Sequence, residues 1–411
     1  MTDNGTTDAD VIIVGGGLMG CVMAGLLARE NISSIVIEAR EQSTKNTAGD
    51  PRALAITPAS RHILQAAEFW NAIPADSIGR FREMQVWDEG GSGSIHFAAA
   101  DLCQPTLGYI IQQDILAQSL HNRLQSVSNV KWYQPATVSA LSINHATAGI
   151  RLHDSRRLSA KLVIAADGGR SAMRDLAGIE YRRHDYHQTA VACLVETERP
   201  HRDTARQRFL STGPLAFLPL PGPHHCGIVW STSPEHAAEL VAMSEQHFNS
   251  ALAAAFDYRL GDILSSERRV AYPLQHAQAA SYCKPRFALI GDAAHTVHPL
   301  AGQGANLGLL DAATLTEVLV SAGNANRDIG LYPVLRRYER WRRGENLIMM
   351  KLLQGFKLLF ENRSHAVMFA RNRGLDIMDV MTPVKNTIMR RAMGLEGDLP
   401  VYARQHTACT G

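Results

Sequence analysis

The feature that most constrains the fold of this chain is a glycine-rich turn between two short apolar runs near the N-terminus. The first run covers residues 10–14, an alanine- and leucine-rich stretch over 21–29 predicts a helix, and the second run covers 34–37. The turn, Gly-x-Gly-x-x-Gly, lies between the first run and the helix. A strand, turn, helix and strand of this length is typical of a dinucleotide-binding βαβ unit.

Each glycine of the turn has a physical role in such a unit. Gly15 allows the tight turn, Gly17 lets a pyrophosphate approach the backbone, and Gly20 lets helix and strand pack closely. Glu38 ends the second strand, where a carboxylate accepts hydrogen bonds from ribose hydroxyls. The motif therefore predicts dinucleotide binding, and it leaves the choice between FAD and NAD open.

Composition limits the class of protein. The chain has 411 residues, of which 45% are hydrophobic and 19% are charged, so two domains with a sizeable core are expected. A net charge of +2 argues against a nucleic-acid surface. The six cysteines are scattered and form no CxxC pair, so neither a disulfide framework nor a thiolate zinc site is indicated. The polar first ten residues and the lack of a long apolar run favour a cytoplasmic protein without a membrane-spanning segment.

Two further strand-to-glycine transitions lie at residues 162–169 and 287–292, and alternating stretches between 181 and 282 predict an inserted antiparallel sheet. The expected fold is α/β, with a Rossmann-type nucleotide-binding domain interrupted by a substrate domain with a mainly antiparallel sheet and followed by a helical C-terminal region. The expected boundaries are 1–80, 103–180 and 283–345 for the nucleotide-binding domain, 81–102 and 181–282 for the substrate domain, and 346–411 for the C-terminal region.

The C-terminal region is basic. Thirteen Lys and Arg stand against five Asp and Glu between residues 336 and 391. The stretch 347–360 has a broad apolar stripe, with Lys351 and Lys357 on the remaining face. A core or dimer-interface helix is the ordinary interpretation, and a homo-oligomer is expected. The alternative is a helix that docks on an anionic membrane surface or on partner enzymes.

The segment 292–311, DAAHTVHPLAGQGANLGLLD, decides between the two dinucleotides. From His298 to Asp311 it resembles the signature of the FAD-dependent hydroxylases of ubiquinone biosynthesis, which act on 2-polyprenylphenols or 2-polyprenyl-6-methoxyphenols. This family is similar to para-hydroxybenzoate hydroxylase. The resemblance extends over nearly the whole chain, and its other pieces are Asp50, Arg52, Ala53 and Leu54; Ala166, Asp167, Gly168, Ser171 and Arg174; Tyr186 and Gln188; Gln207, Arg208, Phe209, Gly213 and Pro214; and Tyr272, Pro273 and Leu274.

These residues also make chemical sense. Asp292 follows a strand and is a natural acceptor for the ribityl hydroxyls of FAD. Gly302 and Gly304 leave room for a flat ring on bare backbone. A helix expected from about residue 305 to 320 would point its N-terminus, with a partial charge of about +0.5, at the flavin.

The resemblance implies FAD as cofactor, NADH or NADPH as a transient electron donor, and the following site residues. Cofactor contacts are expected at Gly15, Gly17, Leu18, Met19, Gly20, Glu38, Ala39, Arg40, Arg52, Gln112, Val138, Asp167, Gly168, Gly291, Asp292, Pro299, Gly302, Gly304, Ala305 and Asn306. Catalytic influence is expected from Arg52 and the Pro299 region, and Tyr186, Gln188 and Phe217 are expected on the substrate side.

Several of these residues have an ordinary structural interpretation as well. Arg52 could be a surface ion-pair partner, Gln112 a helix cap, and Asp167 a turn former. The histidine pair His295 and His298 lies on a glycine-rich loop without a ligand set of metal spacing, so no metal site is expected.

The resemblance implies a monooxygenase that inserts one atom of O2 into the benzenoid ring of a polyprenylated phenol, through a flavin C4a-hydroperoxide. No protein nucleophile is needed, because the cofactor carries the difficult chemistry. Membership of a ubiquinone-biosynthesis complex and a peripheral position on the inner membrane face are compatible with this function. The alternatives are a hydroxylase of small aromatic acids in catabolism and a noncatalytic flavoprotein scaffold.

Overall fold

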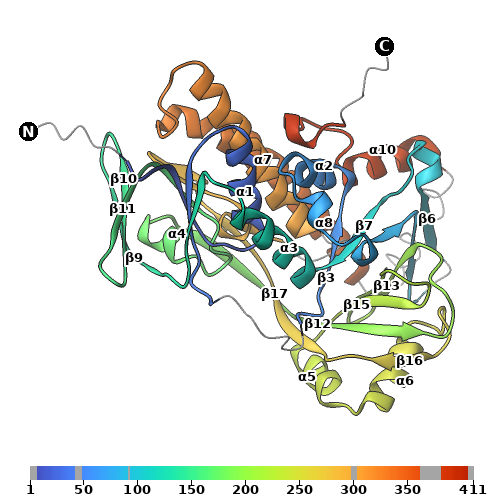
Figure 1. Cartoon of the computed structure of the whole chain (residues 1–411). Helices are drawn as coiled ribbons and strands as arrows, with labels where there is room; N and C mark the ends of the chain where they lie inside the picture. The colour runs from blue at the N-terminus through green and yellow to red at the C-terminus, as the bar shows by residue number, and fades with distance from the viewer. Residues whose placement is uncertain (1–6, 42–48, 91–92, 298–302, 362–380, 406–411) are drawn as a thin grey trace, which may run out of the picture.

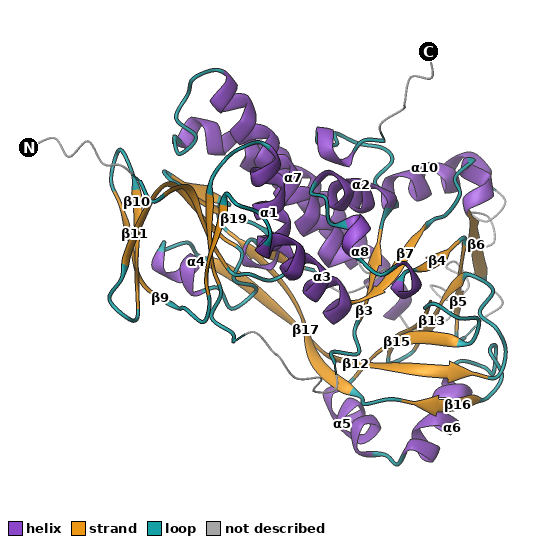
Figure 2. Ribbon diagram, viewed as in Figure 1, coloured by secondary structure: helices purple, strands orange, loops and turns teal. Residues whose placement is uncertain are grey.

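The computed structural model describes residues 7–41, 49–90, 93–297, 303–361 and 381–405. Three β-sheets organise the described residues, and helices cover parts of each (Figure 1, Figure 2). The two larger sheets carry separate clusters of buried apolar side chains.

The first sheet contains the glycine turn. Its strand order is β18-β19-β11-β1-β2-β8, and the antiparallel strands β10 and β9 extend β11. Strands β19, β11, β1, β2 and β8 are parallel to one another, and the four residues of β2 are all buried, as expected for a strand covered on both faces. The bounds are β1 Ala9–Val14, β2 Ser34–Ile37, β8 Val130–Tyr133, β9 Val138–Ile143, β10 Ala148–Leu152, β11 Arg157–Ala165, β18 Cys283–Lys284 and β19 Phe287–Leu289.

The helices α1, α7 and α8 lie together on one side of this sheet (Figure 2). Helix α1 is buried at every position from Gly20 to Leu27, because it packs between the sheet and α7. The helix bounds in this region are α1 Leu18–Arg29, α2 Pro58–Ala66, α3 Gln113–Gln125, α4 Ala172–Leu176, α7 Gln303–Asn324 and α8 Tyr332–Glu361.

The second sheet is mainly antiparallel, with the order β20-β17-β12-β15-β14-β13-β5-β6 and β16 beside β12. Its longest strand, β12, pairs with β17, β15 and β16 (Figure 1). Helices α5 and α6 cover one face. The bounds are β5 Glu83–Asp88, β6 Ser94–Ala98, β12 Tyr181–Thr197, β13 Thr204–Leu210, β14 Gly213–Pro219, β15 His225–Thr232, β16 Ile263–Ser266, β17 Val270–Ala279, β20 His295–Thr296, α5 Pro234–Ala242 and α6 Glu245–Ala255.

A small third sheet, β3-β7-β4, lies between the two larger ones, and α10 packs nearby against η3. The bounds are β3 Ala53–Ile56, β4 Gly79–Phe81, β7 Gly108–Gln112 and α10 Thr382–Ala392. The short 3-10 helices are η1 Trp70–Ala72, η2 Ala75–Ser77, η3 Ala99–Leu102, η4 Gly291–Ala293 and η6 Val401–Ala403.

The expected α/β fold class is confirmed, including the βαβ unit around the glycine turn and the mainly antiparallel second sheet. The helix expected from about residue 305 to 320 is present but longer, since α7 runs from residue 303 to 324. Within the described residues, no helix combines the length and the apolar character that crossing a membrane requires.

Candidate active site

The glycine turn has the geometry that its sequence predicts. Gly15 adopts φ +106°, and a Cβ there would lie 2.4 Å from the carbonyl oxygen of Ala166. A Cβ on Gly20 would lie 1.8 Å from the carbonyl oxygen of Gly15, so helix and turn are in direct backbone contact. Gly17 is different, because no protein atom lies within 4 Å of its ideal Cβ position. The open space at Gly17 is where a pyrophosphate can approach the backbone at the start of α1.

Glu38 is fixed at the end of β2. The backbone amide of Gly16 donates to Oε2 at 2.7 Å, and that of Arg40 donates to Oε1 at 2.9 Å. The amide of Ala136 donates to the carbonyl oxygen of Glu38 at 2.8 Å, which brings the start of β9 at Val138 to the same corner. The carboxylate thus stands beside the glycine turn, where the adenosine end of FAD would bind.

The three glycine transitions of the sequence meet at one edge of the first sheet. The backbone amide of Ala166 donates to the carbonyl oxygen of Val14 at 2.7 Å, and the backbone amide of Ile290 donates to the carbonyl oxygen of Ala165 at 3.0 Å. The ends of β1, β11 and β19 are therefore neighbours. Gly15, Gly168 and Gly291 all adopt positive φ there, at 106°, 80° and 58°.

Asp167 has the character of a cofactor ligand. Its Oδ2 accepts from the amide of Met173 at 3.0 Å, which ties it to α4, but its Oδ1 is buried without a hydrogen-bond partner in the protein. Burial raises the pKa of this carboxyl above its ordinary value, although Ser171 and the Met173 amide act in the other direction. A buried carboxylate oxygen without a partner fits a site completed by a hydroxyl donor of a bound group.

Asp292 is exposed to solvent yet surrounded by protein on most sides. Desolvation raises the pKa of its carboxyl, while the charges of His295 and Arg52 act to lower it. An accessible carboxylate in such surroundings lines a hollow rather than the outer surface. This position agrees with the expected contact to the ribityl hydroxyls.

Arg52 lies near both Asp292 and the second sheet. It pairs with Asp50, and its guanidinium lies 5.6 Å from the centre of the Tyr272 ring in β17. Next to it, Ala53 of β3 pairs with Gln112 of β7, so the structure brings Arg52 and Gln112 together. Gln112 precedes α3 without a side-chain capping hydrogen bond, so the alternative role as a simple helix cap has no support from that contact.

The N-terminus of α7 carries the rest of the flavin signature. The side-chain amide of Asn306 donates to the carbonyl oxygen of Ala55 at 2.8 Å, and its Oδ1 accepts from the amide of Thr57 at 3.0 Å. The first turn of α7, with Gly304 and Ala305, is thereby held next to β3. Pro299 and Gly302 lie outside the described residues.

A buried polar network below this turn is a feature that the sequence analysis missed. His295 Nε2 lies 2.5 Å from Asp311 Oδ2, and Arg342 donates to Asp311 Oδ1 at 2.8 Å. Arg342 also donates to Oδ1 of Asn346 at 2.7 Å. The signal in the sequence was Asp311 at the end of the signature, but its partners come from β20 and α8, which sequence spacing does not connect. Among the described residues, no group of three or more His, Cys, Asp or Glu could hold a metal ion.

The three expected substrate-side residues occupy different places. Tyr186 lies at an irregularity of β12, with its ring 5.8 Å from that of His184. Gln188 is 9% exposed and donates to the carbonyl oxygen of Thr212 at 3.2 Å. Phe217 is buried in the second core, and its ring stacks on Phe256 at 3.9 Å. The substrate roles stay predictions, and the core position of Phe217 does not favour its role.

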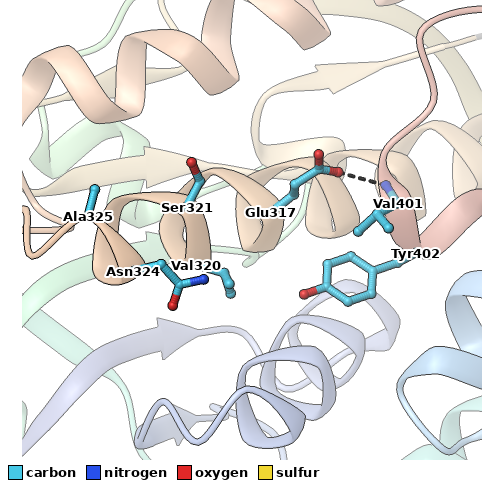
Figure 3. A pocket seen from close by; sticks show the side chains of 7 residues that line it. All are labelled: Glu317, Val320, Ser321, Asn324, Ala325, Val401 and Tyr402. Carbon is cyan, nitrogen blue, oxygen red and sulfur yellow. Dashed lines mark hydrogen bonds between the residues drawn. The ribbon is translucent and has the colours of Figure 1, made fainter.

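A hollow of about 420 Å³ is remote from this region. It lies between the C-terminal half of α7 and η6, where Glu317 accepts from the amide of Val401 at 2.7 Å (Figure 3). Tyr402 lines the hollow, and its hydroxyl donates a hydrogen bond to Oε1 of Glu30, the residue after α1, at 2.9 Å. Because the N-termini of α1 and α7 face the glycine transitions, a hollow at their other ends is separate from the cofactor site.

The residues present fit FAD, with an open approach at Gly17, a fixed carboxylate at Glu38, and Asp167 and Asp292 at the strand ends. The fold and this site are those of an FAD-dependent oxidoreductase. The family model described as an FAD binding domain matches residues 8–343.

The comparisons with known proteins specify the family. The chain is 37% identical to the ubiquinone hydroxylase UbiL of Rhodospirillum rubrum, over 94% of this chain and 90% of the relative. It is 34% identical to the 3-demethoxyubiquinol 3-hydroxylase of Escherichia coli, over 94% and 98%. The crystal structure of p-nitrophenol 4-monooxygenase from Pseudomonas putida shares the fold, with a TM-score of 0.76 at 20% identity over 94% of this chain and 98% of that one. The chain belongs to the FAD-dependent hydroxylases of ubiquinone biosynthesis, and it is a monooxygenase.

Proposed function

We propose that this protein inserts one oxygen atom of O2 into the benzenoid ring of a polyprenylated phenol during ubiquinone biosynthesis. The relatives at 34% and 37% identity that are named as ubiquinone-pathway hydroxylases support the substrate class. The structural observation that carries the proposal is the position of Arg52, which lies over Tyr272 of the second sheet while its charge also acts on Asp292. A ring bound between that sheet and the flavin would lie beside Arg52.

Bound FAD, reduced by NADH or NADPH, supplies the activated oxygen. The residues of this chain position the reactants and exclude water, which is what such a cofactor requires of its protein. The N-terminus of α7 lies close to β3 through Asn306 and provides positive potential for a reduced flavin. Arg52 provides a second positive charge, which Asp50 holds in place.

We propose the cofactor contacts expected from the sequence as the FAD site, with Arg52 and the Pro299 region closest to the reaction. The proposed division of the chain also follows the sequence analysis, with the FAD-binding domain at 1–80, 103–180 and 283–345, the substrate domain at 81–102 and 181–282, and a helical C-terminal region at 346–411. The sheets support it, since strands of the second sheet come from residues 83–98 and 181–279. Strand β20 at 295–296 is an exception to this division. It belongs to the proposed FAD-binding domain by sequence, but it pairs with β17 of the second sheet.

The test is deletion of the gene in its host, followed by identification of accumulated quinone intermediates by mass spectrometry. A prenylated phenol lacking one oxygen is the expected intermediate, and the FAD-loaded protein should convert it in vitro. Normal quinone levels combined with no turnover of the prenylated phenol would reject the proposal.

We propose that the protein works in the cytoplasm at the inner membrane face, as a homo-oligomer or with partner enzymes. Leu347 and Ile348 of α8 are exposed apolar side chains, and Arg340 and Arg343 lie within two turns of them. This combination suits an anionic surface. Co-sedimentation with anionic vesicles should fall as salt rises, and equal binding to neutral vesicles would contradict the electrostatic part. Light scattering measures the oligomeric state.

A further inference from the structure

A second cavity, of about 110 Å³, lies between the small third sheet, the edge of the second sheet and α10. Nine of its eleven lining residues are apolar. The larger ones include Phe81, Met84, Phe97, Leu107, Met389 and Met393.

We propose that this cavity is the tail chamber, the subsite that receives the first part of the isoprenoid tail while the phenol ring lies at the flavin. The inference rests on the proposed function, since it assumes a prenylated substrate. It adds where the tail goes and which elements hold it.

The chemistry of the walls selects an apolar ligand. Among the residues that the structure describes, the polar side chains that line the tail chamber are Thr57 and Asn306. Thr57 Oγ1 is engaged with the amide and hydroxyl of Ser60, at 3.2 and 3.1 Å. The side-chain amide of Asn306 is engaged at both ends, since it donates to the carbonyl oxygen of Ala55 in β3 and accepts from the backbone amide of Thr57. A polar ligand would lose its water hydrogen bonds there and gain few in return, whereas a hydrocarbon loses none.

The tail chamber adjoins the flavin signature. Asn306 lies in the first turn of α7 and forms part of the chamber wall. Met84 and Phe97 pack both against Met389 and Met393 and against the cluster that contains Val297 and Leu307. Val297 in turn lies 3.6 Å from the ideal Cβ position of Gly304. The chamber therefore lies next to the first turn of α7, and apolar side chains connect the two regions.

The size and the material of the walls also fit an isoprene unit. A dry apolar cavity of roughly 150 Å³ holds a benzene molecule, so about 110 Å³ matches the five carbons of one unit. Three of the nine apolar lining residues are methionines, whose unbranched chains adapt to ligands of different shape. Later units of a long tail would leave the chamber past Ala392, an exposed wall residue near the end of α10.

Helix α10 forms the outer wall of the tail chamber and is held by polar contacts. Lys385 donates to the carbonyl oxygen of His96 at 3.1 Å and lies 3.5 Å from Asp101. Asn386 donates to the carbonyl oxygen of Asp101 at 3.3 Å. The wall is therefore attached to β6 and η3, and its methionines are directed to the apolar space.

The test compares two tryptophan variants on α10 in the FAD-loaded full-length protein. Ala392→Trp places an indole at the chamber wall, and Thr387→Trp places one at an exposed position of the same helix that does not line it. The substrates are 2-prenyl-6-methoxyphenol and its tail-less counterpart 2-methoxyphenol. We expect Ala392→Trp to lower kcat/KM at least tenfold for the prenylated phenol and less than twofold for 2-methoxyphenol, since a single methylene can change kcat/KM roughly 10- to 200-fold. Thr387→Trp should change neither.

A second measurement does not depend on turnover. It records the change in Tm on addition of geraniol, an isoprenoid alcohol that lacks the phenol ring. Geraniol should raise the Tm of the wild-type and Thr387→Trp proteins, and the shift should be absent in Ala392→Trp and in the deeper variant Met393→Trp. Unchanged kcat/KM and Tm shifts in Ala392→Trp, or equal loss on both phenols, would overturn the tail chamber. Failure of the wild-type protein to hydroxylate either phenol would instead reject the proposed function, and the geraniol result would still decide the chamber.

Discussion

His295 and Asp311 form a buried pair, with Nε2 of the histidine 2.5 Å from Oδ2 of the aspartate and both side chains at most 1% exposed. The pair joins β20 to α7. Oδ2 of Asp311 also accepts from the amide of Gly291 at 3.2 Å, and Arg342 of α8 binds the other carboxylate oxygen. Asp311 thus connects the loop that carries Asp292 to the two long helices.

We predict that Asp311→Asn destabilises the protein by about 3–5 kcal/mol, because the buried charge of Arg342 loses its partner. Urea unfolding of the apoprotein at pH 7 measures the loss. The control is Asp154→Asn, which removes an exposed pair with Arg156 and should change the stability far less, because solvent screens that pair. A loss at Asp311 no larger than at Asp154 would contradict the role of the network.

The same residue predicts a pH dependence. Burial by itself would raise the pKa of Asp311, but His295 and Arg342 outweigh it and hold the pKa below its ordinary value. A carboxyl whose pKa is lowered by folding stabilises the protein above its unfolded pKa of about 3.9, and this contribution disappears as pH falls through the folded pKa. Between pH 5 and 3, the wild-type protein should therefore lose more stability than Asp311→Asn. Parallel curves of unfolding free energy against pH would contradict this.

Two glycines of the turn should respond differently to the same added methyl group. Gly17→Ala meets no protein atom within 4 Å, so we expect a folded apoprotein whose affinity for FAD falls at least tenfold, because the methyl group occupies the pyrophosphate approach. Gly20→Ala would meet the carbonyl oxygen of Gly15 at 1.8 Å and should lower the Tm of the apoprotein. Flavin fluorescence titration and thermal unfolding separate the two effects. Normal FAD affinity in Gly17→Ala would remove the turn from the cofactor site.

Asp167→Asn should stabilise the apoprotein while weakening FAD binding. Burial raises the pKa of Asp167, so the folded state disfavours its ionised form, and the stability contributed by the protonated form is lost as pH rises through the folded pKa. Asparagine removes this loss at pH 7 and keeps an acceptor for the amide of Met173. We expect higher apoprotein stability together with a roughly tenfold larger Kd for FAD. A less stable apoprotein would mean that Asp167 acts as a structural turn residue.

Arg52→Ala should lower kcat for hydroxylation at least tenfold and leave the Tm of the holoenzyme within a few degrees, because its ion pair in the described structure is with the neighbouring, half-buried Asp50. Stopped-flow measurement of flavin reduction and of product yield would show which step is slowed. The matched control, Arg123→Ala, removes a surface pair with Glu68 and should leave both steps unchanged. Unchanged kinetics in Arg52→Ala would mean that Arg52 is an ordinary surface ion-pair partner without a role in the reaction.

Much of the local structure around the proposed cofactor site was readable from local sequence. The Gly15 turn, Glu38 and the helix after Gly304 each depend on a strand and helix that follow one another directly, and backbone sterics make glycine necessary at such turns. The antiparallel second sheet was readable from alternating polarity between residues 181 and 282.

Other features depended on contacts between distant segments. The partners of Asp311 come from β20 and α8, the Asn306 amide binds β3 about 250 residues earlier, and the tail chamber needs walls from β4, β5, β6 and α10. The core position of Phe217 was hidden for the same reason, since strand alternation does not say which face of a sheet meets the cofactor domain and which meets α6.

The sequence by itself determined the class of cofactor and the family, because short backbone turns that hold a phosphate or a ribose need particular residues at fixed spacing. Only the tertiary structure decided where the buried charges are paired, which side chains of the second sheet pack against α6, and where the apolar cavity beside α10 lies. Those properties arise when segments far apart in the chain exclude water from a shared space, and local sequence patterns do not specify such packing.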